Sequence, residues 1–135
     1  MEKLKQLYKK VYGAFPSAIE KIEGSGSNRA YYRLSNPDVS EKSVIGVVGQ
    51  SRDENHAFIY LTEHFNLRKL PVPSIIAVDE DEMRYLQTDL GNRTLFDALA
   101  KGRAVGGRYT LAERKLLQST IEALPELQFR GARGL

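Results

Sequence analysis

A change of hydrophobic period in the middle of the chain limits the fold more than any other feature of the sequence. Residues 43–49, SVIGVVG, form a short continuous apolar run, which is typical of a central strand of a sheet. Residues 51–65 then place their apolar side chains at helical spacing. The prolines that follow exclude a continued helix, and residues 74–78 and 83–87 are predicted to pair as a hairpin. The middle of the chain therefore predicts a strand, a helix and two further strands.

The segments on either side of this region complete the predicted order. The other predicted elements are an amphipathic helix over residues 2–15, strands over 18–23 and 29–35, a helix over 94–101, a mobile glycine-rich linker over 101–109 and a helix that begins at Thr110. Five strands with one inserted helix predict an α+β protein with a small antiparallel sheet. We expect an N-terminal helix at 1–17, a sheet lobe at 18–91 and a helical region at 92–135.

Composition excludes several functional classes. The chain has no cysteine, which excludes disulfides and thiolate metal sites, and its two histidines are too few to assign metal ligands. No apolar run of about 18 residues and no apolar signal region are present, so we expect a soluble cytoplasmic protein without a membrane partner. The net charge of +3 suits a protein that binds anions. Nucleic acid is not favoured, because Tyr31 and Tyr32 would point to opposite faces of one strand.

Residues 24–28, GSGSN, form a loop of small residues between two predicted strands. Backbone N–H groups that carry little side-chain bulk can approach a phosphate closely. The loop does not open a helix, which excludes a Walker loop and a Rossmann fingerprint. A glycine-rich strand–turn–strand is the arrangement that kinases use. Taken alone, the same residues also describe a flexible hairpin turn.

Four longer segments carry a family resemblance. The stretches SVIGV, ENHAFIYLTEHF, LPVPSIIAVDED and RYLQTDLGNRTLFDAL resemble the nucleotide-binding lobe of the aminoglycoside phosphotransferase family, over residues 18–100. That family is similar to choline kinases and has a protein-kinase-like fold, and the likeness is to its bacterial branches that phosphorylate cell-wall amino sugars at the anomeric position. The resemblance implies an ATP-dependent phosphotransferase that acts on a small hydroxylated substrate, a sugar or an amino sugar. ATP would lie between this lobe and a second one.

The resemblance also implies which residues would bind the nucleotide. The phosphate-covering loop would consist of Gly24, Ser25, Gly26, Ser27 and Asn28. The hinge would be residues 87–91, with Gln87 at the gatekeeper position. The carbonyl of Thr88 would accept a hydrogen bond from the adenine amino group, and the N–H of Leu90 would donate to a ring nitrogen. The apolar walls would be Ile22, Ile45 and Leu86, which are also plausible as ordinary core residues.

The predicted third strand departs from the family pattern. Kinases carry a lysine there, which pairs the nucleotide phosphates with a glutamate of the following helix, but residues 44–48 contain none. Arg33, or Arg29 beside the loop, could supply the positive charge instead, or both could be solvated surface residues. Glu54 would be the helix glutamate. Alternatively, it is only the capping partner of Ser51 in an S-x-x-E pattern.

The residues that would catalyse transfer form the second departure. Phosphotransferases of this kind use one aspartate to position the acceptor hydroxyl and another to hold magnesium. No histidine follows His64 and no aspartate follows Asp97. We therefore expect a nucleotide-binding lobe of a longer enzyme, with ATP and Mg²⁺ bound in the full protein, a C-terminal lobe as its partner, and an exposed face that could form a dimer. The alternative is a non-catalytic kinase-like interaction module, with the N-terminal helix as a docking element.

Overall fold

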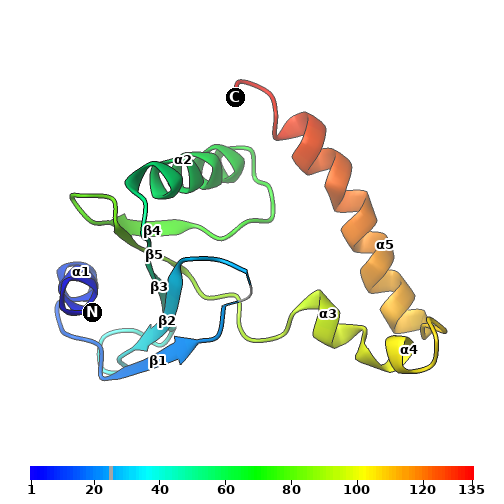
Figure 1. The fold of residues 1–135 in the computed structure, drawn as a ribbon, viewed down its shortest axis with the longest axis horizontal. Helices are drawn as coiled ribbons and strands as arrows, with labels where there is room; N and C mark the ends of the chain where they lie inside the picture. The colour runs from blue at the N-terminus through cyan, green and yellow to red at the C-terminus, as the bar shows by residue number, and fades with distance from the viewer. Residues whose placement is uncertain (25) are drawn as a thin grey trace. The chain divides into compact units, whose positions relative to one another are not determined.

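The computed structural model describes residues 1–24 and 26–135 (Figure 1). Contacts divide the chain into two compact units, Met1–Leu90 (unit 1) and Gly91–Leu135 (unit 2). The N-terminal helix, expected as a separate part, belongs to unit 1. No helix in the described part of the chain combines the length and the apolar character needed to cross a membrane.

Unit 1 contains all the strands of the described chain. Its elements are α1 (Glu2–Tyr12), β1 (Ala18–Ile22), β2 (Ala30–Ser35), β3 (Val44–Val48), α2 (Arg52–Leu67), β4 (Ile75–Val78) and β5 (Arg84–Thr88). The strands form one sheet in the order β1-β2-β3-β5-β4, and every neighbouring pair is antiparallel. The α+β class and the five-stranded antiparallel sheet are therefore confirmed. The sheet places β3 at its centre, in agreement with the continuous apolar run of that segment.

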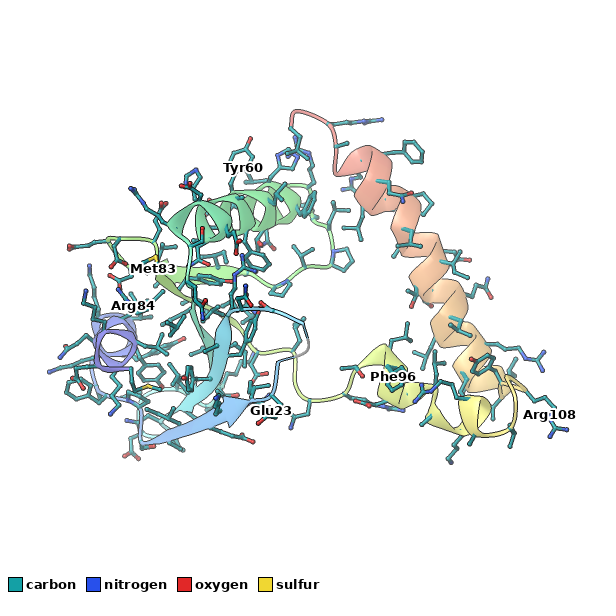
Figure 2. The ribbon with its side chains drawn as sticks, viewed as in Figure 1. Glu23, Tyr60, Met83, Arg84, Phe96 and Arg108 are labelled. Carbon is teal, nitrogen blue, oxygen red and sulfur yellow. The ribbon has the colours of Figure 1, made fainter. Side chains whose placement is uncertain are left out.

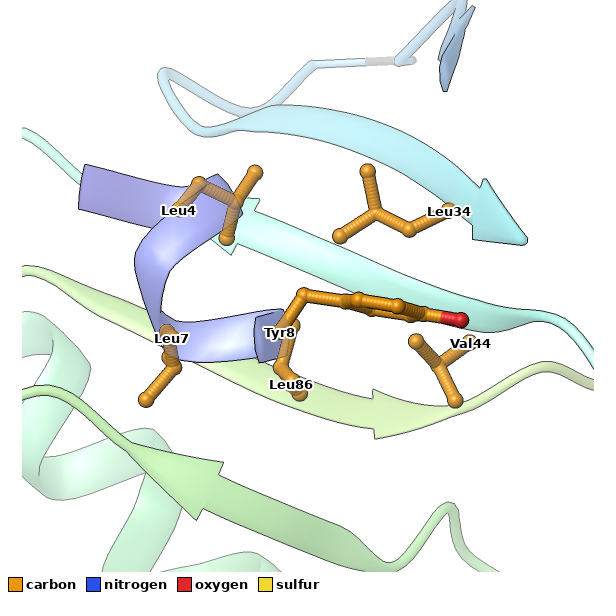
Figure 3. Close-up of a cluster of buried hydrophobic side chains, with 6 residues drawn as sticks. All are labelled: Leu4, Leu7, Tyr8, Leu34, Val44 and Leu86. Carbon is orange, nitrogen blue, oxygen red and sulfur yellow. The ribbon is translucent and has the colours of Figure 1, made fainter. Parts of the chain in front are cut away.

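The first face of the sheet is covered by α1. Three α1 side chains are buried there with residues of β2, β3 and β5, and the cluster consists of Leu4, Leu7, Tyr8, Leu34, Val44 and Leu86 (Figure 3). A Cβ atom on Gly46 would lie 2.9 Å from both methyl carbons of Leu4. Glycine at this central position therefore allows α1 to approach the strand. Three side chains of the apolar face of α1 are therefore buried in this core, and the docking role considered above stays a prediction.

The second face of the sheet is covered by α2. Ile45, Val47, Ile59 and Tyr85 form its buried cluster, with Phe58 among the partly buried residues packed against it. The rings of Phe58 and Tyr85 stack at 5.6 Å between centroids. Ser51 caps α2, because its hydroxyl accepts a hydrogen bond from the N–H of Glu54. The sheet is thus buried on both faces, each by one helix (Figure 1).

Unit 2 is helical in the described structure. It contains α3 (Leu95–Ala98), α4 (Ala100–Ala104), α5 (Leu111–Pro125) and the π-helical segment η1 (Glu126–Arg130). Reciprocal capping boxes open α3, with Thr94 and Asp97, and α5, with Thr110 and Glu113. The helix predicted over 94–101 is therefore two short helices, and α4 extends over residues 101–104 of the segment expected to be a linker. After Pro125, which has no N–H for an α-helical bond, the chain continues as η1.

The turn between α4 and α5 is held by a buried carboxylate. Glu113 accepts hydrogen bonds from the N–H of Gly102 at 2.9 Å and of Thr110 at 3.1 Å. These backbone donors, Thr110 first and then Gly102, lower the pKa of Glu113. In the same unit, the guanidinium of Arg103 lies 3.4 Å from the ring centroid of Phe96, which is labelled in Figure 2.

Candidate functional site

The loop between β1 and β2 offers unpaired backbone donors. Of the predicted loop residues, Ser25 lies outside the described residues. Gly26 has φ +74°, a left-handed conformation that glycine adopts without strain. Among the described residues, the N–H groups of Gly26, Ser27 and Asn28 have no hydrogen-bond partner. The hydroxyl of Ser27 accepts from the N–H of Arg29 at 3.2 Å, which fixes the end of the loop. These free donors could bind an anion.

The segment after β5 has a second unpaired donor. The N–H of Leu90 makes no hydrogen bond to any described residue, and its side chain is 74% exposed. Thr88 is held on the β4 side of β5. Its N–H donates to the carbonyl of Ser74, and its hydroxyl accepts from the N–H of Ser74. The backbone of residues 88–90 is thus hydrogen-bonded at Thr88, whereas the N–H of Leu90 remains open to a ligand.

The loop and the segment after β5 border the same face of the sheet, at opposite ends of the strands. Ile22 and Ile45 belong to the α2-side cluster, and Gln87 lies on that side because it is two residues from Tyr85. The side-chain oxygen of Gln87 is buried and has no hydrogen-bond partner among the described residues. Four strand residues, or about 13 Å, separate the two ends along β2. A ligand that reached both segments would have to be elongated and lie along the strands.

Leu86 does not belong to this face. It is opposite Gly46 in the sheet and is fully buried in the α1-side cluster. Its predicted role as an apolar wall beside Ile22 and Ile45 is therefore wrong. Side chains alternate along a strand, so the neighbour of Gln87 must point to the other side.

Arg33 is engaged at the end of the sheet away from the loop. Its guanidinium pairs with Asp89 through two hydrogen bonds, of 2.5 and 3.2 Å, and the hydroxyl of Ser43 donates to the same carboxylate at 2.6 Å. The side chains of Arg33 and Asp89 are 16% and 8% exposed. The hydrogen bond to Asp89 is the main cause that raises the pKa of Arg33. Arg33 therefore fixes the segment after β5, about 10 Å along β2 from the loop, and its predicted phosphate role stays a prediction.

The first turn of α2 presents Asn55 inward, where the sequence suggested Glu54. Glu54 is exposed, and its N–H bonds to the cap Ser51. Asn55 is fully buried. The signal that could have identified Asn55 is its position, because it shares the apolar face of the helix with Phe58, Ile59 and Thr62. A polar residue in an apolar stripe must find partners inside the fold.

Asn55 connects three separate segments of unit 1. Its side-chain oxygen accepts from Nε of Arg29 at 3.1 Å, and its amide nitrogen donates to the carbonyl of Glu82, in the β4–β5 turn, at 2.9 Å. A Cβ atom at position 49 would lie 2.2 Å from the amide nitrogen of Asn55. Only glycine therefore fits at this position, directly after β3. Arg29 also donates from Nη2 to the carbonyl of Glu54 at 3.1 Å. The end of the loop, helix α2 and the β4–β5 turn are therefore joined through one buried side chain.

The donor inventory fits a phosphate-bearing ligand better than a metal ion. The free N–H groups of the loop suit phosphate oxygens, and the open N–H of Leu90 suits the polar edge of a base. Over the described residues, no three or more His, Asp or Glu side chains gather to hold a metal ion. No magnesium ligand is assigned among these residues, and Mg²⁺ binding stays a prediction.

Two cavities of unit 1 lie outside this region. One, of about 470 Å³, lies between α1 and the β4–β5 turn, and the other, of about 440 Å³, lies where the end of α2 meets the start of β4. Neither is lined by a predicted nucleotide-binding residue.

No protein-family model and no curated protein sequence matches this chain.

Proposed function

We propose that unit 1 is the nucleotide-binding lobe of an ATP-dependent phosphotransferase with a protein-kinase-like fold. Its acceptor would be a small hydroxylated molecule, a sugar or an amino sugar. The observation that carries the proposal is the combination of strand order and open donors. The antiparallel order β1-β2-β3-β5-β4 has one helix between β3 and β4, a glycine-containing loop between β1 and β2, and an unpaired N–H after β5. This is the arrangement of parts that kinases use around the nucleotide.

In this proposal, each end of the α2-side face binds one part of ATP. The N–H groups of Gly26, Ser27 and Asn28 would bind phosphate oxygens, and the Thr88 carbonyl and Leu90 N–H would bind the adenine edge. ATP supplies the phosphoryl group, and these residues only bind and orient it. No described residue is assigned to activate an acceptor, so we propose nucleotide binding, not turnover, for these 135 residues. An enzyme of this kind would act in the cytoplasm, where ATP is made.

Titration with ATP tests the proposal directly. In ¹H–¹⁵N spectra of the full chain, the amides of residues 24–28 and 88–90 should shift together as ATP is added, and those of α1 should not. Leu90→Pro removes the donor N–H and should weaken ATP binding at least about tenfold. Leu90→Ala is the matched control, because it keeps the N–H and changes only an exposed side chain. The proposal fails if ATP shifts neither segment, or if both variants bind ATP equally well.

A second candidate is a non-catalytic interaction module. It is favoured by the large apolar side chains that unit 2 exposes, among them Phe96, Leu111, Ile121 and Phe129. A protein of this kind would show no response to ATP in the titration above.

A further inference from the structure

Two arginines of the β2 region could contact a phosphate, and the structure distinguishes them by what each already binds. Arg33 is held in the ion pair with Asp89, and its Nη1 also lies 3.4 Å from Glu20. All three of its nitrogen positions therefore have carboxylate partners. Arg29 has no ion pair with any described carboxylate. Its charge is therefore not neutralised within the described structure.

Arg29 is fixed by neutral groups that leave part of its guanidinium open. Nε and Nη2 donate to the Asn55 side chain and the Glu54 carbonyl, and the guanidinium carbon lies 5.0 Å from the ring centroid of Phe58. Nη1 makes no hydrogen bond among the residues that the structure describes. A guanidinium has five N–H donors, so donors remain for an anion while the helix contact is kept.

The position of Arg29 places this charge beside the loop. Its own N–H bonds to the Ser27 hydroxyl, one residue from the free N–H of Asn28. Phosphate sites combine backbone N–H groups with a fixed cation, because charge-assisted hydrogen bonds to phosphate are stronger than neutral ones. Asn55 is an amide, so it orients the guanidinium without cancelling its charge, as a carboxylate would.

We propose that Arg29 contacts the phosphates of the bound nucleotide and takes the place of the lysine that β3 lacks. One edge of its guanidinium holds α2 through Asn55 and Glu54, and Nη1 donates to a phosphate oxygen beneath the loop. The inference rests on the proposed function of the same site. It has a consequence that a purely structural arginine would not have: phosphates, and not adenosine, should stabilise the first turn of α2.

The test compares three ligands, ATP, ADP and adenosine, on the full chain. In Arg29→Gln, ATP binding should weaken at least about tenfold, ADP binding less, and adenosine binding by less than about twofold. Arg29→Lys keeps the charge and should recover part of the ATP affinity. Arg52→Gln is the matched control. It removes an exposed arginine at the start of α2, whose ion-pair partner among the described residues is Glu82, and should leave all three affinities unchanged.

A measurement on the unchanged chain does not depend on whether the Arg29 variants fold. In the unchanged chain, ATP should slow amide hydrogen exchange at residues 54–56, whereas adenosine at equal occupancy should not. The inference is overturned if Arg29→Gln weakens adenosine and ATP equally, if it weakens neither, or if adenosine slows exchange as much as ATP does. If the unchanged chain binds none of the three ligands, the proposed function itself fails. If adenosine and ATP bind with equal affinity, the result supports a site for the base and overturns only the phosphate role of Arg29.

Discussion

At the residue scale, two fully buried side chains with polar groups, Asn55 and Tyr85, lie on the α2 side of the sheet. On the α2 side, Asn55 is completely enclosed and uses both its oxygen and its nitrogen. A neutral amide loses less hydration on burial than a carboxylate does, so it can orient Arg29 at a lower desolvation cost than a buried ion pair. On the same side, Tyr85 is equally enclosed, but its hydroxyl has no partner among the described residues.

The hydroxyl of Tyr85 should make the stability of unit 1 depend on alkaline pH. Burial raises its pKa to about 12, against a smaller lowering by Arg29. Because the unfolded side chain ionises near pH 10, the unfolded chain has lost this proton between about pH 10 and 12 while the folded chain keeps it. The contribution of Tyr85 to stability is therefore complete below pH 10 and is lost as pH rises, by about 1 kcal/mol at pH 11. Urea unfolding at pH 8 and pH 11 measures it.

Tyr85→Phe isolates this effect from other groups that titrate at alkaline pH. At pH 8 we expect the variant to equal or exceed the unchanged chain in stability, by up to about 1 kcal/mol, because it removes an unsatisfied buried hydroxyl. At pH 11 its relative advantage should grow. Tyr60→Phe is the control, since Tyr60 lies on the outer side of α2 and is 49% exposed (Figure 2). A Tyr85→Phe chain less stable than the unchanged one at pH 8 would show that the hydroxyl has a partner.

At the scale of elements, the absence of a side chain at Gly46 allows α1 to pack closely against the sheet. Gly46 lies at the centre of β3, between Tyr32 and Leu86 of the neighbouring strands. A Cβ atom here would meet Leu4 at 2.9 Å and Leu34 at 3.0 Å, closer than real Cβ contacts. Glycine weakens a strand in general, so its presence at this position is explained by the close approach of the helix.

Gly46→Ala should destabilise unit 1 by about 1–3 kcal/mol through overpacking. Leu4→Val shortens the side chain that the new Cβ atom would meet, so the double variant should lose less stability than the sum of the single variants. Urea unfolding of the four chains measures this interaction. Gly24→Ala is a steric control, because a Cβ atom there would lie 3.6 Å or more from its neighbours. Strictly additive losses would contradict the proposed contact.

The segment after β5 is held by one residue of β2 and one residue that precedes β3. Asp89 receives hydrogen bonds from Arg33 of β2 and from Ser43, just before β3. A charge pair this enclosed loses much hydration, and two hydrogen bonds with a third donor offset that loss. The element that would bind adenine is therefore oriented by tertiary contacts as well as by its own strand.

At the scale of the whole molecule, the two units differ in how much apolar surface they bury. Both clusters of buried hydrophobic residues belong to unit 1, whereas unit 2 exposes side chains such as Ile121 at 63% and Phe129 at 75%. Exposed apolar area of this kind favours association. Unit 1 should accordingly be stable alone, and unit 2 should be the source of any self-association.

A shortened chain of residues 1–92 should fold and remain monomeric. Its amide spectrum should superimpose on that of the full chain for residues 1–87, because the core clusters and the Asp89 contacts are all retained. Sedimentation should show concentration-dependent association of the full chain only. Ile121→Lys in the full chain should reduce that association without changing the unit 1 spectrum. A shortened chain that is unfolded would contradict the independence of unit 1.

Most of the elements were predictable because local rules determine them. The apolar run of β3, the caps at Ser51, Thr94 and Thr110, and the hairpin after the prolines each depend on residues a few positions apart. The predictions of secondary structure failed where a contact with residues farther along the chain determines the local conformation. Residues 101–104 were expected in a linker, but Gly102 donates to the buried carboxylate of Glu113 and the segment is part of a helix.

Short-range order along the chain thus accounts for the class of the fold and for the position of the loop, because periodicity, caps and turns involve only near neighbours. The partners of each polar side chain come from residues far away in the sequence. Arg33 and Asp89 are 56 positions apart, and Arg29 and Asn55 are 26 apart. Once the strands had paired in their actual order, Arg33 lay beside a carboxylate and Arg29 beside an amide. That difference in partner, set by strand pairing and helix packing, leaves one of two similar arginines with its charge open to a ligand.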